Sequence, residues 1–211
     1  MSNPFDNLSE ADKFNLFNLL GVHFYKFNKN EEILPTIKHE NIICIVMEGS
    51  AHILYIEYNG NEIIVEKLQK DSVFGTNISA TNNENCQIIA KEDTEIAVID
   101  YKKLMNSKNL NHAYFNIFFK NLFDIINTKI KEKNERINIL EKKQIREKLL
   151  EYFDIEYKKY HSRIIHLPFS LKDFADYMAV NRSAMFRELK NLKEEKFIDI
   201  KNRKITLLYK N

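Results

Sequence analysis

Apolar and polar positions alternate with period two in the first half of the chain. Between Glu31 and Asp100, short β-branched runs are separated by turn signals. The run AHILYIEY, residues 51–58, alternates as a strand with one buried face would. Asn59-Gly60 follows it and is the strongest hairpin signal in the chain. This region therefore predicts an antiparallel β-roll or barrel.

Helical spacing flanks this region on both sides. Ser9 precedes a pattern ending at Leu20, which predicts a short amphipathic helix with a serine cap. Between Asn111 and Pro168 the chain has no Pro or Gly, and apolar residues recur at steps of three and four. We predict a long helix here, followed by a second from about residue 139 to residue 157.

The long helix is able to pack either against a second copy of itself or only against its own domain. In the first case, the residues expected at the dimer interface are Phe115, Phe118, Phe119, Leu122, Ile126 and Ile130.

The residues after Pro168 predict two short helices and a hairpin. Ser170 precedes the first helix, and Asn181 is a favourable N-cap for the second. The hairpin, residues 197–208, has a basic tip at residues 201–204. This order of elements predicts a winged helix, in which the second helix enters the major groove of DNA.

Arginine binds guanine through two hydrogen bonds or holds phosphate, which suits the arginines of the second helix. The candidate DNA-binding residues are Ser170, Asn181, Arg182, Ser183, Phe186, Arg187, Lys190 and Arg203. The alternative is a helical pair that serves only for packing or for binding another protein.

Charge divides the chain. Residues 1–128 carry 11 Lys+Arg against 17 Asp+Glu, whereas residues 129–211 carry 21 against 13. A basic C-terminal part suggests a polyanionic partner, because Lys and Arg gain affinity by releasing counterions from phosphates.

No stretch approaches the roughly 18 apolar residues of a membrane span, and no signal-peptide pattern is present, so we expect a cytoplasmic protein.

Nearly the whole chain resembles the CRP/FNR family of bacterial transcription regulators. The resemblance is carried by EGSAHILYIEYNGNEIIVEKLQKDSVFG in the roll and LKDFADYMAVNRSAMFRELKNLKEEKFI near the C-terminus. It implies an α+β fold with three parts. Residues 1–108 would form a cyclic-nucleotide-binding-like sensor domain, which is a double-stranded β-helix (jelly-roll-like). Residues 109–138 would form a dimerisation helix, and residues 139–211 a winged helix-turn-helix. It also implies a homodimer that binds a roughly palindromic DNA site and works with RNA polymerase. Such a protein is not expected to be an enzyme.

Two positions depart from the family's recognition helix. Arg182 and Arg187 match its two arginines. Ser183 stands where many members have a base-reading glutamate, and Phe186 stands where Gly or Ser is usual. The family's usual base preference therefore cannot be carried over.

The roll lacks the residues that hold cyclic AMP in family members, namely a glutamate after Phe-Gly and a later Arg-Ser or Arg-Thr. Here Phe74-Gly75 is followed by Thr76-Asn77, and the later stretch is 85–88 (NCQI). A buried phosphate without a cation is costly, which argues against cyclic AMP. The effector, if there is one, is left open; its candidate pocket comprises Phe74, Gly75, Thr76, Asn77, Cys86 and Gln87.

Cysteine and histidine content argues against two other cofactors. Two cysteines exclude an iron-sulfur cluster with four cysteine ligands from one chain, and the six histidines show no pattern specific for haem. Cys44 lies in an apolar run typical of an inert core thiol. The polar stretch before Cys86 allows an exposed, oxidant-sensing thiol, although no nearby Lys or Arg would lower its pKa.

Two other functions remain open. A cupin-like enzyme would need a close His-x-His with a Glu and a distant His, whereas the roll offers isolated His39 and His52. The other is a small-molecule-binding roll whose C-terminal half docks a protein partner.

Overall fold

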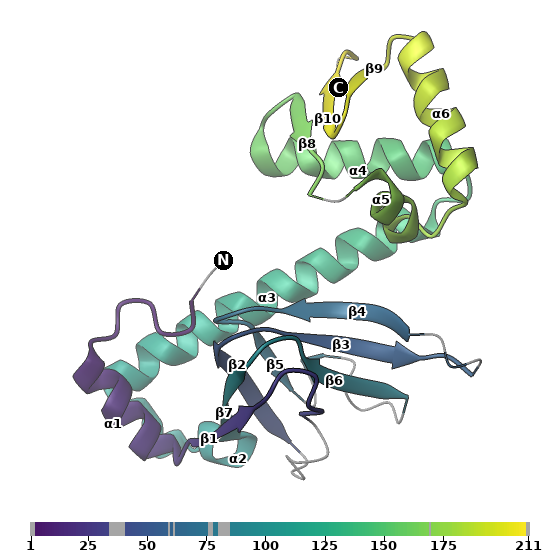
Figure 1. The fold of residues 1–211 in the computed structure, drawn as a ribbon. Helices are drawn as coiled ribbons and strands as arrows, with labels where there is room; N and C mark the ends of the chain where they lie inside the picture. The colour runs from purple at the N-terminus through teal and green to yellow at the C-terminus, as the bar shows by residue number, and fades with distance from the viewer. Residues whose placement is uncertain are drawn as a thin grey trace. The chain divides into compact units, whose positions relative to one another are not determined.

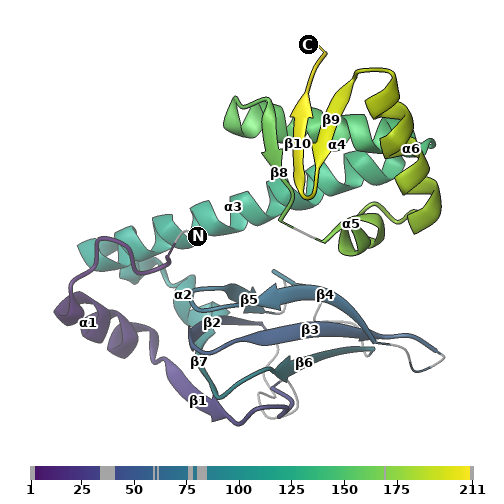
Figure 2. The ribbon, with the colours of Figure 1, turned by 45° about the horizontal axis from the view of Figure 1, so that its top comes forward.

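The computed structural model describes residues 3–33, 41–58, 60, 62–75, 78–79, 85–168 and 170–209. The chain forms two compact units, residues 1–128 and residues 129–211. Figure 1 labels their helices and strands, and Figure 2 shows the same ribbon from a second side.

The first unit is an antiparallel roll with helices before and after it. Its helices are α1 (Glu10–Leu20), α2 (Tyr101–Leu104), the 3-10 helix η1 (Ser107–Asn111) and the first part of α3 (Ala113–Glu141). Its strands are β1 (His23–Phe27), β2 (Ile42–Glu48), β3 (Ala51–Ile56), β4 (Glu62–Leu68), β5 (Val73–Gly75), β6 (Cys86–Ala90) and β7 (Thr94–Asp100).

Within the described residues these strands form two sheets, with the orders β1-β7-β2-β5 and β4-β3-β6. The paired strands run antiparallel, which confirms the predicted roll. Strand β1 was not predicted, because its aromatic residues precede the β-branched runs and most of its side chains are exposed or half-buried.

Strand β2 lies between two apolar cores. Ile43 and Ile45 pack with the helices α1 and α3, whereas Cys44 and Val46 pack in the core that lines the two sheets. Successive side chains of a strand point to opposite faces, so a strand covered on both sides must be apolar at every position. This explains the unbroken apolar run in the sequence of β2.

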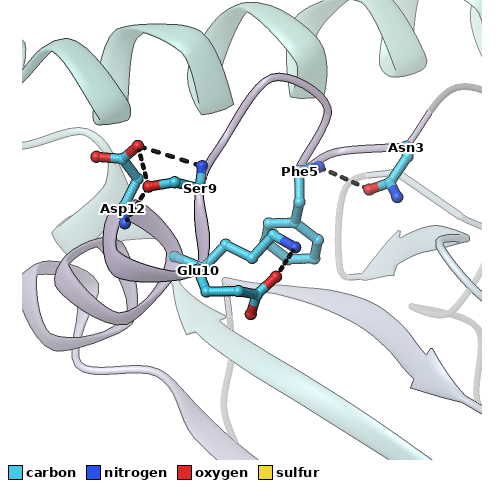
Figure 3. A network of polar contacts seen from close by, with 6 residues as sticks. Asn3, Phe5, Ser9, Glu10 and Asp12 are labelled. Atoms are coloured by element: carbon cyan, nitrogen blue, oxygen red, sulfur yellow. Dashed lines mark hydrogen bonds and ion pairs between the residues drawn. The ribbon is translucent and has the colours of Figure 1, made fainter.

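The serine cap predicted at the start of α1 is confirmed, and the structure shows that it is one half of a capping box. Ser9 Oγ accepts a hydrogen bond from the Asp12 N–H at 3.1 Å, and the Asp12 carboxylate accepts from the Ser9 N–H at 3.2 Å (Figure 3). The preceding segment is held by Phe5, whose buried ring stacks on Phe118 with the ring centroids 5.7 Å apart. The N-terminal segment and α3 thus share one core.

Strand β4 is an edge strand with an apolar exposed surface. It pairs with β3, as the predicted hairpin requires, while Asn59 of the turn lies outside the described residues. The side chains of Ile63, Ile64 and Val65 are exposed, and charged residues flank them at Glu62 and Lys67.

Gly75 ends β5 where two backbones approach closely. Its φ is 145°, and a Cβ at this position would lie 2.2 Å from the carbonyl oxygen of Ile42. Only glycine fits without moving the β2 backbone.

The second unit contains a three-stranded sheet and a helical pair. Its elements are α4 (Ile145–Tyr160), β8 (Ile164–His166), α5 (Leu171–Tyr177), α6 (Arg182–Glu194), β9 (Ile198–Lys201) and β10 (Lys204–Leu207). The sheet order is β8-β10-β9 (Figure 2). Fully buried side chains that join these elements include Leu149, Phe153, Phe174, Met178, Met185, Leu192 and Ile205.

This architecture confirms the predicted fold class and corrects two boundaries. The helix expected from residue 139 begins only at Ile145, because α3 continues to Glu141 and Gln144 has an extended backbone. The same helix, expected to end at about residue 157, continues to Tyr160, and β8 begins at Ile164. Thr206 of β10 pairs with Ile164 of β8, so this strand depends on a partner about 40 residues later.

Candidate nucleic-acid interface and effector region

Side-chain caps fix the starts of both helices of the helical pair. Ser170 Oγ accepts a hydrogen bond from the Asp173 N–H at 3.2 Å, at the start of α5. Asn181 Oδ1 accepts from the Ala184 N–H at 3.2 Å, at the start of α6. Ala179, with φ of 50°, turns the chain between them. Ser170 and Asn181 are thus engaged in capping, and they place the first turn of each helix.

The buried stripe of α6 decides which side chains face outward. Met185, Leu189 and Leu192 lie in the core of the second unit. The exposed residues on the other faces of this helix and its cap include Asn181, Arg182, Ser183, Phe186, Arg187 and Lys190. The structure therefore gathers the predicted α6 residues on an accessible surface.

Arg182 and Phe186 are in contact on this surface. The Arg182 guanidinium carbon lies 5.6 Å from the centroid of the Phe186 ring, a cation–π arrangement across one helical turn. The ring contacts a neighbour on its own helix, which favours one orientation of the arginine.

The hairpin after α6 carries the predicted basic tip. Lys201 of β9 pairs with Lys204 of β10, and Asn202, with φ of 56°, turns the chain between them. The side chains of Lys201, Arg203 and Lys204 are exposed. The Arg203 carbonyl accepts a hydrogen bond from the Leu167 N–H at 2.9 Å, which ties the tip to the segment after β8.

Helix α3 carries two apolar stripes, and the residues predicted for dimerisation are split between them. Phe115, Phe118 and Leu122 are 2%, 0% and 2% exposed and belong to the core of the first unit. Their burial assigns them to the fold of the single chain, not to a surface that a partner could reach. They were misplaced because both stripes have helical spacing.

The second stripe is more accessible. Phe119 and Ile126 are half-buried, whereas Phe123, Ile130 and Ile137 are 57%, 51% and 51% exposed. Steps of four, three, four and seven separate these residues, which is the spacing of a coiled-coil seam. Phe123 and Ile137 were not predicted as interface residues, although this heptad spacing could have identified them.

Most of the predicted effector residues that the structure describes are buried. Phe74 and Gly75 are buried, Gln87 is half-buried, and Thr76 and Asn77 lie outside the described residues. Ser79 Oγ, just after them, donates a hydrogen bond to the Glu66 carboxylate at 3.2 Å. None of Phe74, Gly75, Cys86 and Gln87 is basic, so the described candidate residues supply no cation for a phosphate.

Both thiols lie in unreactive environments. Cys44 is fully buried, and burial raises its pKa to about 12. Cys86 is only 9% exposed, and burial raises its pKa as well. The exposed thiol considered for Cys86 was wrong, because Cys86 is the first residue of β6 and its side chain packs inward there.

The described part of the chain shows neither a cluster of metal ligands nor a helix that could span a membrane. It contains no group of three or more His, Cys, Asp or Glu side chains placed to hold a metal ion. None of its helices is both long enough and apolar enough to cross a membrane.

Comparisons with known proteins support the roll and the whole fold. The family model of the cyclic nucleotide-binding domain matches residues 25–107. No curated protein matches the chain. A solved mutant of CooA from Carboxydothermus hydrogenoformans is similar, with 18% identity, 97% of this chain and 88% of that chain covered, and a TM-score of 0.59.

Two further solved structures share the architecture. CprK complexed with OCPA has 19% identity, 95% and 92% coverage of this chain and that chain, and a TM-score of 0.63. The Catabolite Activator Protein of Thermus thermophilus has 14% identity, 97% and 92% coverage, and a TM-score of 0.52. These findings confirm, for the fold, the resemblance to the CRP/FNR regulators that the sequence indicated.

Proposed function

We propose that this chain is a homodimeric, sequence-specific DNA-binding transcription regulator of the CRP/FNR type. The observation that carries the proposal is the exposed surface of α6, where Arg182, Ser183, Phe186 and Arg187 lie together behind an Asn181 cap. Such a surface at the start of the second helix is the one that enters the major groove.

Charge on the second unit supports a DNA partner. Residues 129–211 carry eight more basic than acidic side chains. The hairpin tip adds exposed cations at Lys201, Arg203 and Lys204. Cations of this kind hold phosphates and fix the protein on the duplex, while α6 reads base edges.

The exposed stripe of α3 supports a homodimer. A second copy of the helix would cover Phe123, Ile130 and Ile137, which are about half exposed in the single chain. A two-fold dimer would bind a roughly palindromic site, and RNA polymerase would be its further partner in the cytoplasm.

The roll is proposed to sense something other than cyclic AMP, or to act without an effector. None of the candidate effector residues is basic, and this supports an effector other than cyclic AMP, because a buried phosphate without a cation is costly. An enzymatic role is not part of the proposal, and neither is an iron-sulfur cluster or haem. Functionally, the chain is divided into a sensor at 1–108, a dimerisation helix at 109–138 and a DNA-binding part at 139–211.

Selection from a random duplex library tests the function. The purified full chain is expected to enrich a palindromic sequence and to bind it with an affinity that falls as salt rises. Enrichment of no sequence, together with no binding at low salt, would contradict the proposal.

Arg187→Ala then separates base reading from phosphate binding. We expect it to cost about 1–3 kcal/mol of binding to the selected site if Arg187 reads a base, with little effect on random DNA. Equal losses on both DNAs would assign Arg187 to phosphate. Lys102→Ala, at an exposed lysine of the first unit, is the charge-matched control and is expected to change neither affinity.

A further inference from the structure

One arginine outside the helical pair reaches two carboxylates of α6. Arg146 lies in the first turn of α4. Its Nη1 donates to Glu195 Oε1 at 3.0 Å and lies 3.4 Å from Glu188 Oε1, while its Nη2 pairs with Glu195 Oε2. The guanidinium carbon also lies 5.3 Å from the centroid of the Phe197 ring. One side chain of α4 therefore holds the last two turns of α6.

Both carboxylates depend on this arginine. Glu188 Oε2 accepts a hydrogen bond from Asn191 Nδ2 at 3.2 Å, but Glu188 Oε1 is buried and accepts none within the described residues. Glu195 follows the last turn of α6, where a negative charge opposes the helix dipole. Its hydrogen bond to Arg146 lowers the pKa of Glu195 and raises that of Arg146.

The first turn of α4 also holds the other helix of the pair. Lys148 Nζ donates a hydrogen bond at 3.1 Å to the carbonyl oxygen of Met178, the residue that ends α5. Arg146 and Lys148, two positions apart on α4, thus make separate polar contacts with α6 and α5.

The buried stripe of α6 sets which face of the helix points inward, and a directional polar contact restricts its rotation further. The buried stripe of α6 is held by the hydrophobic effect, which has no directional preference. A bidentate arginine–carboxylate pair does have one, because its two parallel hydrogen bonds require a single orientation. Glu188 and Glu195 are seven residues apart, on one face of the helix and about 10 Å apart along it. A cation set between them resists both rotation and sliding of α6.

We propose that Arg146 is a positioning residue for DNA reading: it sets the rotation at which α6 presents Arg182, Phe186 and Arg187 to the bases. This inference rests on the proposed DNA-binding function. Glu188 is the link, since it follows Arg187 directly in α6. Arg146 thus governs base preference through α6, without a base contact of its own.

The test compares Arg146→Met with the unmodified chain on the selected site and on a scrambled duplex. Arg146→Met keeps the length of the side chain and removes its charge and donors. We expect about a tenfold loss of the ratio of the two affinities, similar to one mismatched base pair, with binding to scrambled DNA unchanged. Lys142→Met removes a comparable ion pair, to Glu151 at 3.1 Å, and is expected to leave the ratio intact.

A double variant separates positioning from stability. Arg146→Met removes the cation that lies beside the partly buried Glu188 carboxylate, so a lower melting temperature is expected. Arg146→Met combined with Glu188→Met removes that charge, and the melting temperature is expected to recover while the affinity ratio stays reduced. A ratio that recovers together with the melting temperature would assign Arg146 a purely structural role.

The remaining outcomes are distinct. If the unmodified chain selects a site and Arg146→Met keeps both the ratio and the base preferred at each position, the positioning inference is overturned and the DNA-binding function stands. If the unmodified chain selects no site, both are overturned.

Discussion

Helix α3 allows a direct test of how the chain assembles, because mutations on its two apolar stripes are expected to have different effects. One stripe is expected to determine association of two copies, and the other the stability of the single chain. Leu122 lies on the stripe that the chain buries by itself, and Ile130 lies on the stripe that it leaves about half exposed. Ile130→Glu is expected to dissociate the dimer without unfolding the monomer. Leu122→Ala is expected to destabilise the monomer.

The size of each effect follows from burial. Fully burying an isoleucine contributes about 1.5–3 kcal/mol, so covering the exposed half contributes about 1 kcal/mol. A dimer loses two such contributions, about 2 kcal/mol, which weakens association roughly 30-fold, and the cost of burying two carboxylates adds to this. Leu122→Ala in a closed core is expected to cost about 2–5 kcal/mol of folding free energy.

Sedimentation velocity over a range of concentrations measures the first effect, and thermal unfolding followed by circular dichroism measures the second. Ile137→Glu is the matched variant at the next seam position and is expected to behave like Ile130→Glu. A dimer that survives both glutamates would refute the seam, and a monomeric Leu122→Ala protein with an unchanged melting temperature would refute the division into two stripes.

Three further predictions concern single sites. Gly75→Ala is expected to lower the melting temperature far more than Gly60→Ala, because both have positive φ but only the first meets backbone within 4 Å; similar shifts would contradict this. Iodoacetamide is expected to leave Cys44 and Cys86 unlabelled in the native protein and to label both in urea, measured by intact mass. Asn181→Ala is expected to cost about 1 kcal/mol of stability in thermal unfolding and Asn181→Asp much less, unless the cap contributes nothing.

Elements with a strong local signal could be predicted from the sequence. The Ser9 cap, the β-branched runs and the Asn181 cap each depend on residues a few positions apart, and all three are present in the structure. Strand β8 depends on pairing with β10 and has little local signal, so it was missed. Local chemistry determines helix starts and turns, whereas distant pairing determines short strands.

The candidate site shows the same division. Exposure of Arg182 and Arg187 follows from the spacing of the buried stripe in α6 and could be predicted. The role of Arg146 could not, because its partner Glu195 lies 49 residues further along the chain. Burial of Cys86 was also missed, since the polar residues before it gave no sign that β6 begins there.

The exposed edge of β4 has a consequence for the protein during expression. Among the described strands β4 is an edge strand with three successive exposed apolar side chains; such an edge is a template onto which another chain can add, and it promotes aggregation. The charges of Glu62 and Lys67 on either side of Ile63–Val65 act as gatekeepers, because a second strand in register would bring like charges together or bury them. The solubility of this protein at high concentration is therefore expected to depend on these two surface charges, and both lie in the first unit, away from α6 in the sequence.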